Sequence, residues 1–182
     1  MTYRPTWVRE HRIALATAGY VGYSAVMLRL DRQMQATGGP GIIPFELAGS
    51  AAKAEGIMAR WGEEGMRAAR RSMWLDFGYM TSYGILLALL VDRRRRRRGH
   101  PAWLSALAAG AVGGDAVEGV ALLRVLDHRD VATNAHIAQV SASVKFAILA
   151  AALGYAVYPG KSQARGNTPW PDFYLAQLTT CS

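Results

Sequence analysis

Four charged residues interrupt otherwise apolar stretches of this chain: Asp76, Asp115, Glu118 and Lys145. An ionisable side chain inside a bilayer costs free energy, so it normally pairs with another group or performs a task. Asp115 and Glu118 are three residues apart, which makes them neighbours on one face of a helix. Three acids and one base could bind a cation, an amine or a polar head group, or transfer a proton through a carboxyl. They also fit a purely structural ion pair that fixes the register of the helices.

The elements that carry these residues are four apolar blocks, each long enough to cross a bilayer as a helix. The blocks cover residues 13–30, 73–91, 102–126 and 135–158. No small-x-small cleavage site follows the first block, so we expect an uncleaved helix rather than a signal peptide. The sequence therefore predicts an all-α fold, a four-helix transmembrane bundle formed by residues 1–160. Residues 161–182 are expected to form a polar C-terminal tail.

The spacing of the polar residues predicts that they meet in one layer of the bundle. At the helical rise, the four charged residues lie roughly 20–24 Å from the end of the bundle that carries residues 93–98. On the second helix a polar stripe continues from Asp76, and on the fourth helix Ser141 precedes Lys145 by one turn. The predicted ligand-binding residues are Asp76, Tyr79, Tyr83, Asp115, Glu118, Ser141 and Lys145. Their excess negative charge would be offset by a protonated carboxyl, by a bound cation or amine, or by an arginine such as Arg71 or Arg124.

The first outer loop is expected to contain a short amphipathic helix. Glycines and prolines in residues 31–45 predict a loop. Ser50 is a suitable N-cap for a helix over residues 51–61, and Gly62 is expected to end it. One face of this helix is apolar and the other is charged, so we predict that it lies at the membrane surface. A helix packed over the end of the bundle is the alternative.

Basic residues set the expected location of the protein. The formal net charge is +8, and six consecutive arginines occupy residues 93–98 between two apolar blocks. Positive residues beside a span favour the cytoplasmic side, which predicts an inner-membrane protein with both termini in the cytoplasm. The run lacks the interleaved aromatic residues or motif of a nucleic-acid interface, so we expect no nucleic-acid partner.

The sequence contains few signals for a metal site, a cofactor or a catalytic nucleophile. Cys181 is the only cysteine and the four histidines are scattered, so we expect no metal site. No phosphate loop or dinucleotide fingerprint is present, and we expect no cofactor. Ser141 and Lys145 could form a nucleophilic dyad, but no glycine-rich elbow surrounds the serine.

Three stretches together resemble a group of uncharacterised bacterial integral membrane proteins with four predicted spans. They are residues 44–48 with Trp61-Gly62, residues 75–77 with Tyr83-Gly84, and residues 115–118 followed by residues 122–126. The group often has Asp-x-x-Glu-Asn in its third span, whereas this chain has Gly119 in place of the asparagine. The resemblance implies the four-span topology without an activity. It also draws attention to Glu46, which could fold back from the outer loop toward the charged layer.

Three hypotheses for function follow. The first is a membrane protein without enzymatic activity whose polar pocket binds a small ligand, a lipid head group or a cation. The second is a membrane-embedded enzyme acting on a lipid or isoprenoid, with one carboxyl as a general acid. The third is a proton- or cation-coupled carrier. The expected partners are the lipid bilayer and a small-molecule or lipid ligand, and the sequence leaves a homo-oligomer or a larger membrane complex open.

Overall fold

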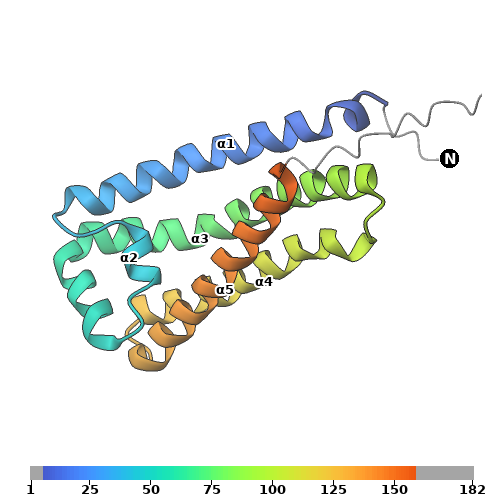
Figure 1. Ribbon diagram of the computed structural model, residues 1–182. Helices are drawn as coiled ribbons and strands as arrows, with labels where there is room; N and C mark the ends of the chain where they lie inside the picture. The colour runs from blue at the N-terminus through green and yellow to red at the C-terminus, as the bar shows by residue number, and fades with distance from the viewer. Residues whose placement is uncertain (1–5, 159–182) are drawn as a thin grey trace, which may run out of the picture.

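The computed structural model describes residues 6–158, which are almost entirely helical (Figure 1). The elements are α1 (Thr6–Ala36), α2 (Ile42–Glu46), α3 (Ala51–Arg98), the 3-10 turn η1 (Ala102–Ala106), α4 (Leu107–Leu126) and α5 (Val131–Val157). Within residues 6–158, four helical stretches are long and apolar enough to cross a membrane, and they coincide with the predicted spans to within one residue or extend beyond them. The described part of the chain is therefore all-helical, as the apolar blocks predicted, and its four apolar helices indicate a membrane protein.

The long helices run side by side in alternating directions, and α3 lies at the centre of the arrangement (Figure 1). α1 packs along α3, whereas α5 packs against both α4 and α3. The beginning of α3, α2 and the turn between α4 and α5 share one end of the bundle. The beginning of α1, the end of α3 and the end of α5 share the other.

The segment that precedes Gly62 folds across the end of the bundle. Gly62 has φ +56°, so it interrupts α3 with a backbone conformation that favours glycine. Ser50 caps the segment by accepting a hydrogen bond from the Lys53 amide at 3.4 Å. The apolar face is buried in the core through Ala54, Ile57, Met58 and Trp61, while the charged face is exposed. Packing over the bundle end, the alternative, is thus observed, and a position of this helix at the membrane surface stays a prediction.

The predicted loop over residues 31–45 is wrong in part, because α1 continues to Ala36 and α2 forms within the loop. The Asp31 carboxylate explains both features: it accepts hydrogen bonds from the Gln35 side chain at 2.6 Å and from the Ile42 amide at 2.7 Å. Pro44 is compatible with α2 because it occupies the first turn, where amide groups have no helical acceptor. Sequence patterns did not indicate α2 because its glycine- and proline-rich surroundings are typical of loops.

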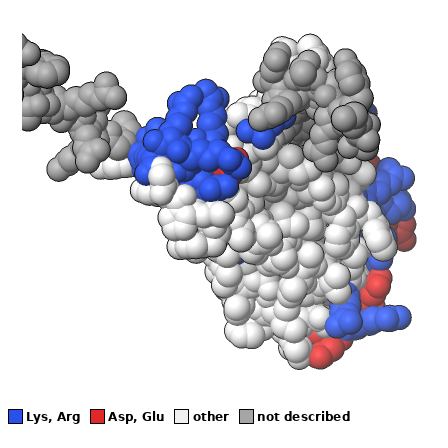
Figure 2. All heavy atoms as spheres, turned by 90° about the vertical axis from the view of Figure 1, so that its right-hand side faces the viewer, with Lys and Arg blue, Asp and Glu red and all other residues white. Residues whose placement is uncertain are grey.

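The six-arginine run lies at the end of the bundle where α5 finishes. Arg98 donates a hydrogen bond to the Tyr158 carbonyl at 2.7 Å, and Arg94 donates to the same oxygen. In Figure 2 basic side chains form a dense group at the upper left, and basic and acidic side chains mix along the right edge. The surface between them is broad and uncharged. Which end faces the cytoplasm stays a prediction.

Replacing Gly84 by leucine is expected to lower the free energy of unfolding by about 1–3 kcal/mol, because it overpacks the contact between α3 and α4. A Cβ at this buried position would lie only 2.5 Å from Val112 Cγ2. Thermal unfolding in detergent would measure the change. Gly113→Leu is the matched control, since a Cβ at Gly113 meets nothing within 4 Å. Equal destabilisation by both substitutions would contradict this view of the contact.

Candidate ligand-binding site in the bundle

Lys145 lies at the centre of a buried group of carboxyls contributed by two other elements. Its Nζ is 2.8 Å from Asp115 Oδ1 and 2.8 Å from Glu118 Oε2, both on α4. The Glu46 carboxyl of α2 is farther away, at 3.7 Å. All four side chains are buried. Three carboxyls therefore share one ammonium group. If all three carboxyls ionise, the single positive charge of Lys145 offsets only part of their negative charge.

Glu46 reaches this group because the core holds α2 in place. Phe45, its neighbour, packs against Trp61 with ring centroids 4.9 Å apart. The Trp61 indole donates a hydrogen bond to the Pro40 carbonyl at 2.6 Å, which fixes the chain just before α2. Burial raises the pKa of the Glu46 carboxyl and the nearby Asp115 acts in the same direction, while Lys145 opposes them. Burial thus favours a protonated Glu46, which would reduce the excess negative charge.

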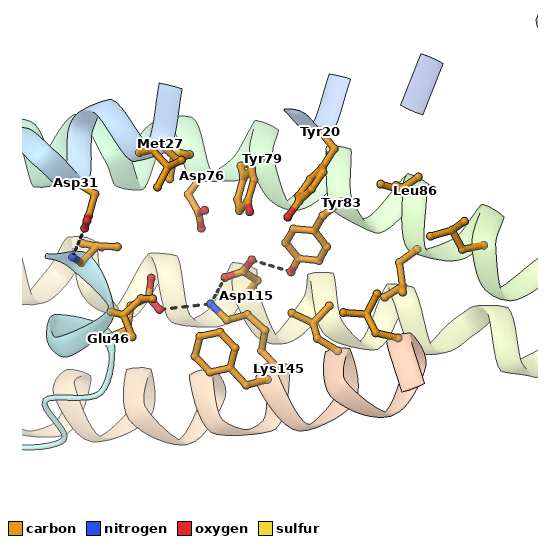
Figure 3. A pocket seen from close by; sticks show the side chains of 18 residues that line it. Tyr20, Met27, Asp31, Glu46, Asp76, Tyr79, Tyr83, Leu86, Asp115 and Lys145 are labelled. Carbon is orange, nitrogen blue, oxygen red and sulfur yellow. Dashed lines mark hydrogen bonds and ion pairs between the residues drawn. The ribbon is translucent and has the colours of Figure 1, made fainter. Parts of the chain in front are cut away.

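Asp76 and a row of tyrosines form the opposite wall of the site (Figure 3). The Tyr83 hydroxyl donates a hydrogen bond to Asp115 Oδ2 at 2.7 Å. Tyr79 lies between two aromatic neighbours: it meets Tyr83 edge-on and stacks on Tyr20 of α1, with centroids 5.7 Å apart in each pair. Asp76 is half-buried and, among the described residues, has neither a hydrogen bond nor an ion pair through its side chain.

These side chains face a cavity of about 390 Å³. Its polar end contains Glu46, Asp76, Asp115 and Lys145 together with the three tyrosines. Its other part is lined by apolar side chains from α3 and α5: Leu86, Leu87, Leu90, Phe146, Leu149 and Leu153. α1 closes one side through Tyr20, Met27, Leu28 and Asp31. The cavity is therefore amphipathic, with its carboxyls and amine at one end and its leucines at the other.

The structure brings most of the predicted site residues together, with exceptions. Asp76, Tyr79, Tyr83, Asp115 and Lys145 line the cavity, whereas Glu118 lies behind its wall and pairs with Lys145. Ser141 is half-buried, does not line the cavity and makes no hydrogen bond to Lys145 in the described region, so no dyad forms.

The two arginines that could have balanced the charge lie elsewhere. Arg71 lines a separate groove, and Arg124 is exposed. Within residues 6–158, no group of histidine, cysteine or carboxylate side chains is arranged to hold a metal ion.

The contribution of α1 to the cavity is the part that sequence reasoning missed. Tyr20, Met27 and Asp31 are spaced by seven and four residues, so they share one face of α1. That spacing was available in the sequence. It gave no signal because two of the three lie in an apolar block whose only charge, Arg29, is near its end, and because Asp31 was assigned to the loop.

Comparison of the chain with family models, with curated proteins and with solved structures gives no match. The resemblance to four-span bacterial membrane proteins stays a prediction. Within residues 6–158, the fold is an all-helical bundle with charged residues buried between its helices, and its four apolar helices indicate a small membrane protein.

Proposed function

We propose that this protein binds an amphiphile that carries an amine head group, and that it does so without catalysis. The head group would occupy the polar end of the cavity, and the hydrocarbon chain would lie along the leucines of α3 and α5. The observation that carries the proposal is the amphipathic lining of a single cavity, with carboxyls at one end and a leucine-rich arm at the other.

The charges of the site favour an amine over an anion. Lys145 is shared by the carboxyls of Glu46, Asp115 and Glu118, and Asp76 has no cationic partner among residues 6–158. A carboxylate in a low-dielectric site gains free energy from a nearby positive charge. The rings of Tyr79, Tyr83 and Tyr20 also line the cavity, and an aromatic wall would add a second attraction, since ammonium groups bind favourably to aromatic rings.

The route of entry would run between α1 and α5. Both helices pack on α3, and the cavity lies between them with lining residues from each. A lipid-like molecule would move sideways from the bilayer with its chain still in an apolar environment. Its head group would cross only the short distance to Asp76. Access from within the membrane would keep the cost of desolvating the hydrocarbon chain low.

Asp76→Asn is expected to weaken binding of a long-chain primary alkylamine by about 10- to 100-fold. A hydrogen bond between charged groups contributes about 1.5–3 kcal/mol, and asparagine removes the charge with little change in shape. The alcohol of the same chain length should bind with nearly unchanged affinity to both proteins. Ligand-induced thermal stabilisation of the purified protein, titrated with each amphiphile, measures the two affinities.

Glu55→Gln, on the exposed face of the first α3 segment, is the matched control and should leave amine binding unchanged. Equal affinity of the native protein for amine and alcohol would overturn the proposed head group. Undiminished amine binding by the Asp76 variant would overturn the assigned site.

The enzymatic and carrier hypotheses from the sequence stay predictions. A product formed from lipid extract and lost on Asp115 substitution would favour an enzyme. Proteoliposome flux that depends on the carboxyls would favour a carrier. The proposed binding function needs neither result.

A further inference from the structure

A second groove lies between α1 and α3, on a different face of α1 from the cavity. It has a volume of about 720 Å³. α1 contributes Val26, Arg29, Leu30 and Gln33, spaced as one helical face. α3 contributes Arg67, Arg70, Arg71, Trp74 and Leu75, again close to one face. Two helix faces thus place four arginines around one groove, at the end of the bundle opposite to residues 93–98.

Two of these arginines are already paired. Arg70 donates to Asp127 at 2.7 Å and to the Leu126 carbonyl at 3.3 Å. Arg67 is 3.4 Å from Glu63 in an exposed pair. Arg29 of α1 and Arg71 of α3 have no acidic partner among residues 6–158, and both are exposed. The groove therefore presents two uncompensated guanidinium groups, one from each helix.

The rest of the groove is apolar and suited to a membrane boundary. Trp74 is 65% exposed, and indole rings prefer the level of the lipid head groups. Val26, Leu30 and Leu75 continue the lining. One turn deeper the helices come together, since a Cβ at Gly78 would lie 2.4 Å from the Tyr23 hydroxyl oxygen. The open space is thus confined to the end of the contact between α1 and α3.

We propose that this groove binds an anionic phospholipid, with Arg29 and Arg71 holding its phosphate and Trp74 packing beside its glycerol and upper acyl chain. Guanidinium groups bind phosphate oxygens through paired, charge-assisted hydrogen bonds. The order of basic rim, indole and aliphatic lining matches the order of phosphate, glycerol and hydrocarbon in a phospholipid. This site is independent of the amine-binding cavity, and either proposal can fail without the other.

The test uses the full chain reconstituted with equal amounts of phosphatidylglycerol and phosphatidylcholine, followed by native mass spectrometry of the lipids that remain bound. The native protein should retain phosphatidylglycerol preferentially. The double variant Arg29→Gln with Arg71→Gln should retain about 10- to 30-fold less, since each basic residue near a lipid surface contributes about 1 kcal/mol. The control Arg93→Gln with Arg97→Gln removes the same charge from exposed positions at the other end and should retain phosphatidylglycerol.

Equal loss in both double variants would show only a general effect of charge and would overturn the proposal. Adding inorganic phosphate tests whether the groove binds the whole lipid or phosphate alone. Full displacement of phosphatidylglycerol by millimolar phosphate would also overturn the proposal. Thermal unfolding in detergent reports correct folding of the Arg29 and Arg71 variant. If its unfolding transition is lost, the milder pair Arg29→Lys with Arg71→Lys replaces it and should show reduced but measurable preference, because lysine keeps the charge without the paired geometry. No reduction in any folded variant would contradict the assignment.

Discussion

Replacing Lys145 by methionine is expected to lower the free energy of unfolding by about 3–5 kcal/mol, because it leaves a buried group of carboxyls without its cation. Asp115 and Glu118 each lie 2.8 Å from the ammonium, and both are buried on α4. Methionine fills a similar volume, so the loss would reflect charge rather than a cavity. Thermal or denaturant unfolding in a fixed detergent measures the effect.

A compensating variant separates the ion pair from the packing. Lys145→Met combined with Asp115→Asn and Glu118→Gln removes the charges together and should recover part of the lost stability, since a buried amide costs less free energy than a buried carboxylate without its cation. The single Lys145 variant should therefore be the less stable of the two. If it is as stable as the native protein, the carboxyls are not held as anions by Lys145.

Trp61→Ala is expected to cost about 3–5 kcal/mol, the usual loss when a fully buried tryptophan is truncated. Trp61 is 1% exposed, packs against Phe45 and donates a hydrogen bond to the Pro40 carbonyl. Its ring also fills the space beside Gly39, where a Cβ would lie 2.3 Å from Cδ1. Unfolding measurements in detergent test the size of the loss.

Trp61→Ala should also disturb the cavity, because the same indole positions α2 and hence the Glu46 side chain. Trp61→Phe keeps most of the apolar contact and should be clearly less destabilising than the alanine variant. Trp103→Ala, at a position 63% exposed, should change stability little. A loss at Trp103 equal to that at Trp61 would show that the assay responds to any tryptophan rather than to this contact.

The helices could be predicted from the sequence because their signals are local. Continuous apolar stretches located the four long helices, and Gly62 and Ser50 marked a break and a cap that are both observed. The ends of α1 were not predictable in the same way. Residues 31–36 are mostly polar, and their helical conformation is supported by Asp31, whose partners include the distant Ile42 amide.

The arrangement of side chains around the cavity depends on how the helices are rotated relative to one another. Sequence spacing shows only which residues share a face of the same helix. Asp115 and Glu118 were recognisable as neighbours, and their meeting with Lys145 followed from similar depths. Ser141 has nearly the same helical direction as Lys145, yet it does not line the cavity. Tyr20 and the leucine-rich arm emerge only from the relative rotation of α1, α3 and α5. The amphipathic character of the cavity was therefore not visible in the sequence.

Arg94 and Arg98 donate hydrogen bonds to the Tyr158 carbonyl directly after α5, whereas Arg95 and Arg96 pair with Asp92 of their own helix. Arg93 and Arg97 make neither kind of contact within residues 6–158, and both side chains are exposed. Arg94 and Arg98 thus tie the end of α3 to the end of α5. One hexapeptide therefore combines a fastening between two helices with exposed positive charge at the same end of the bundle.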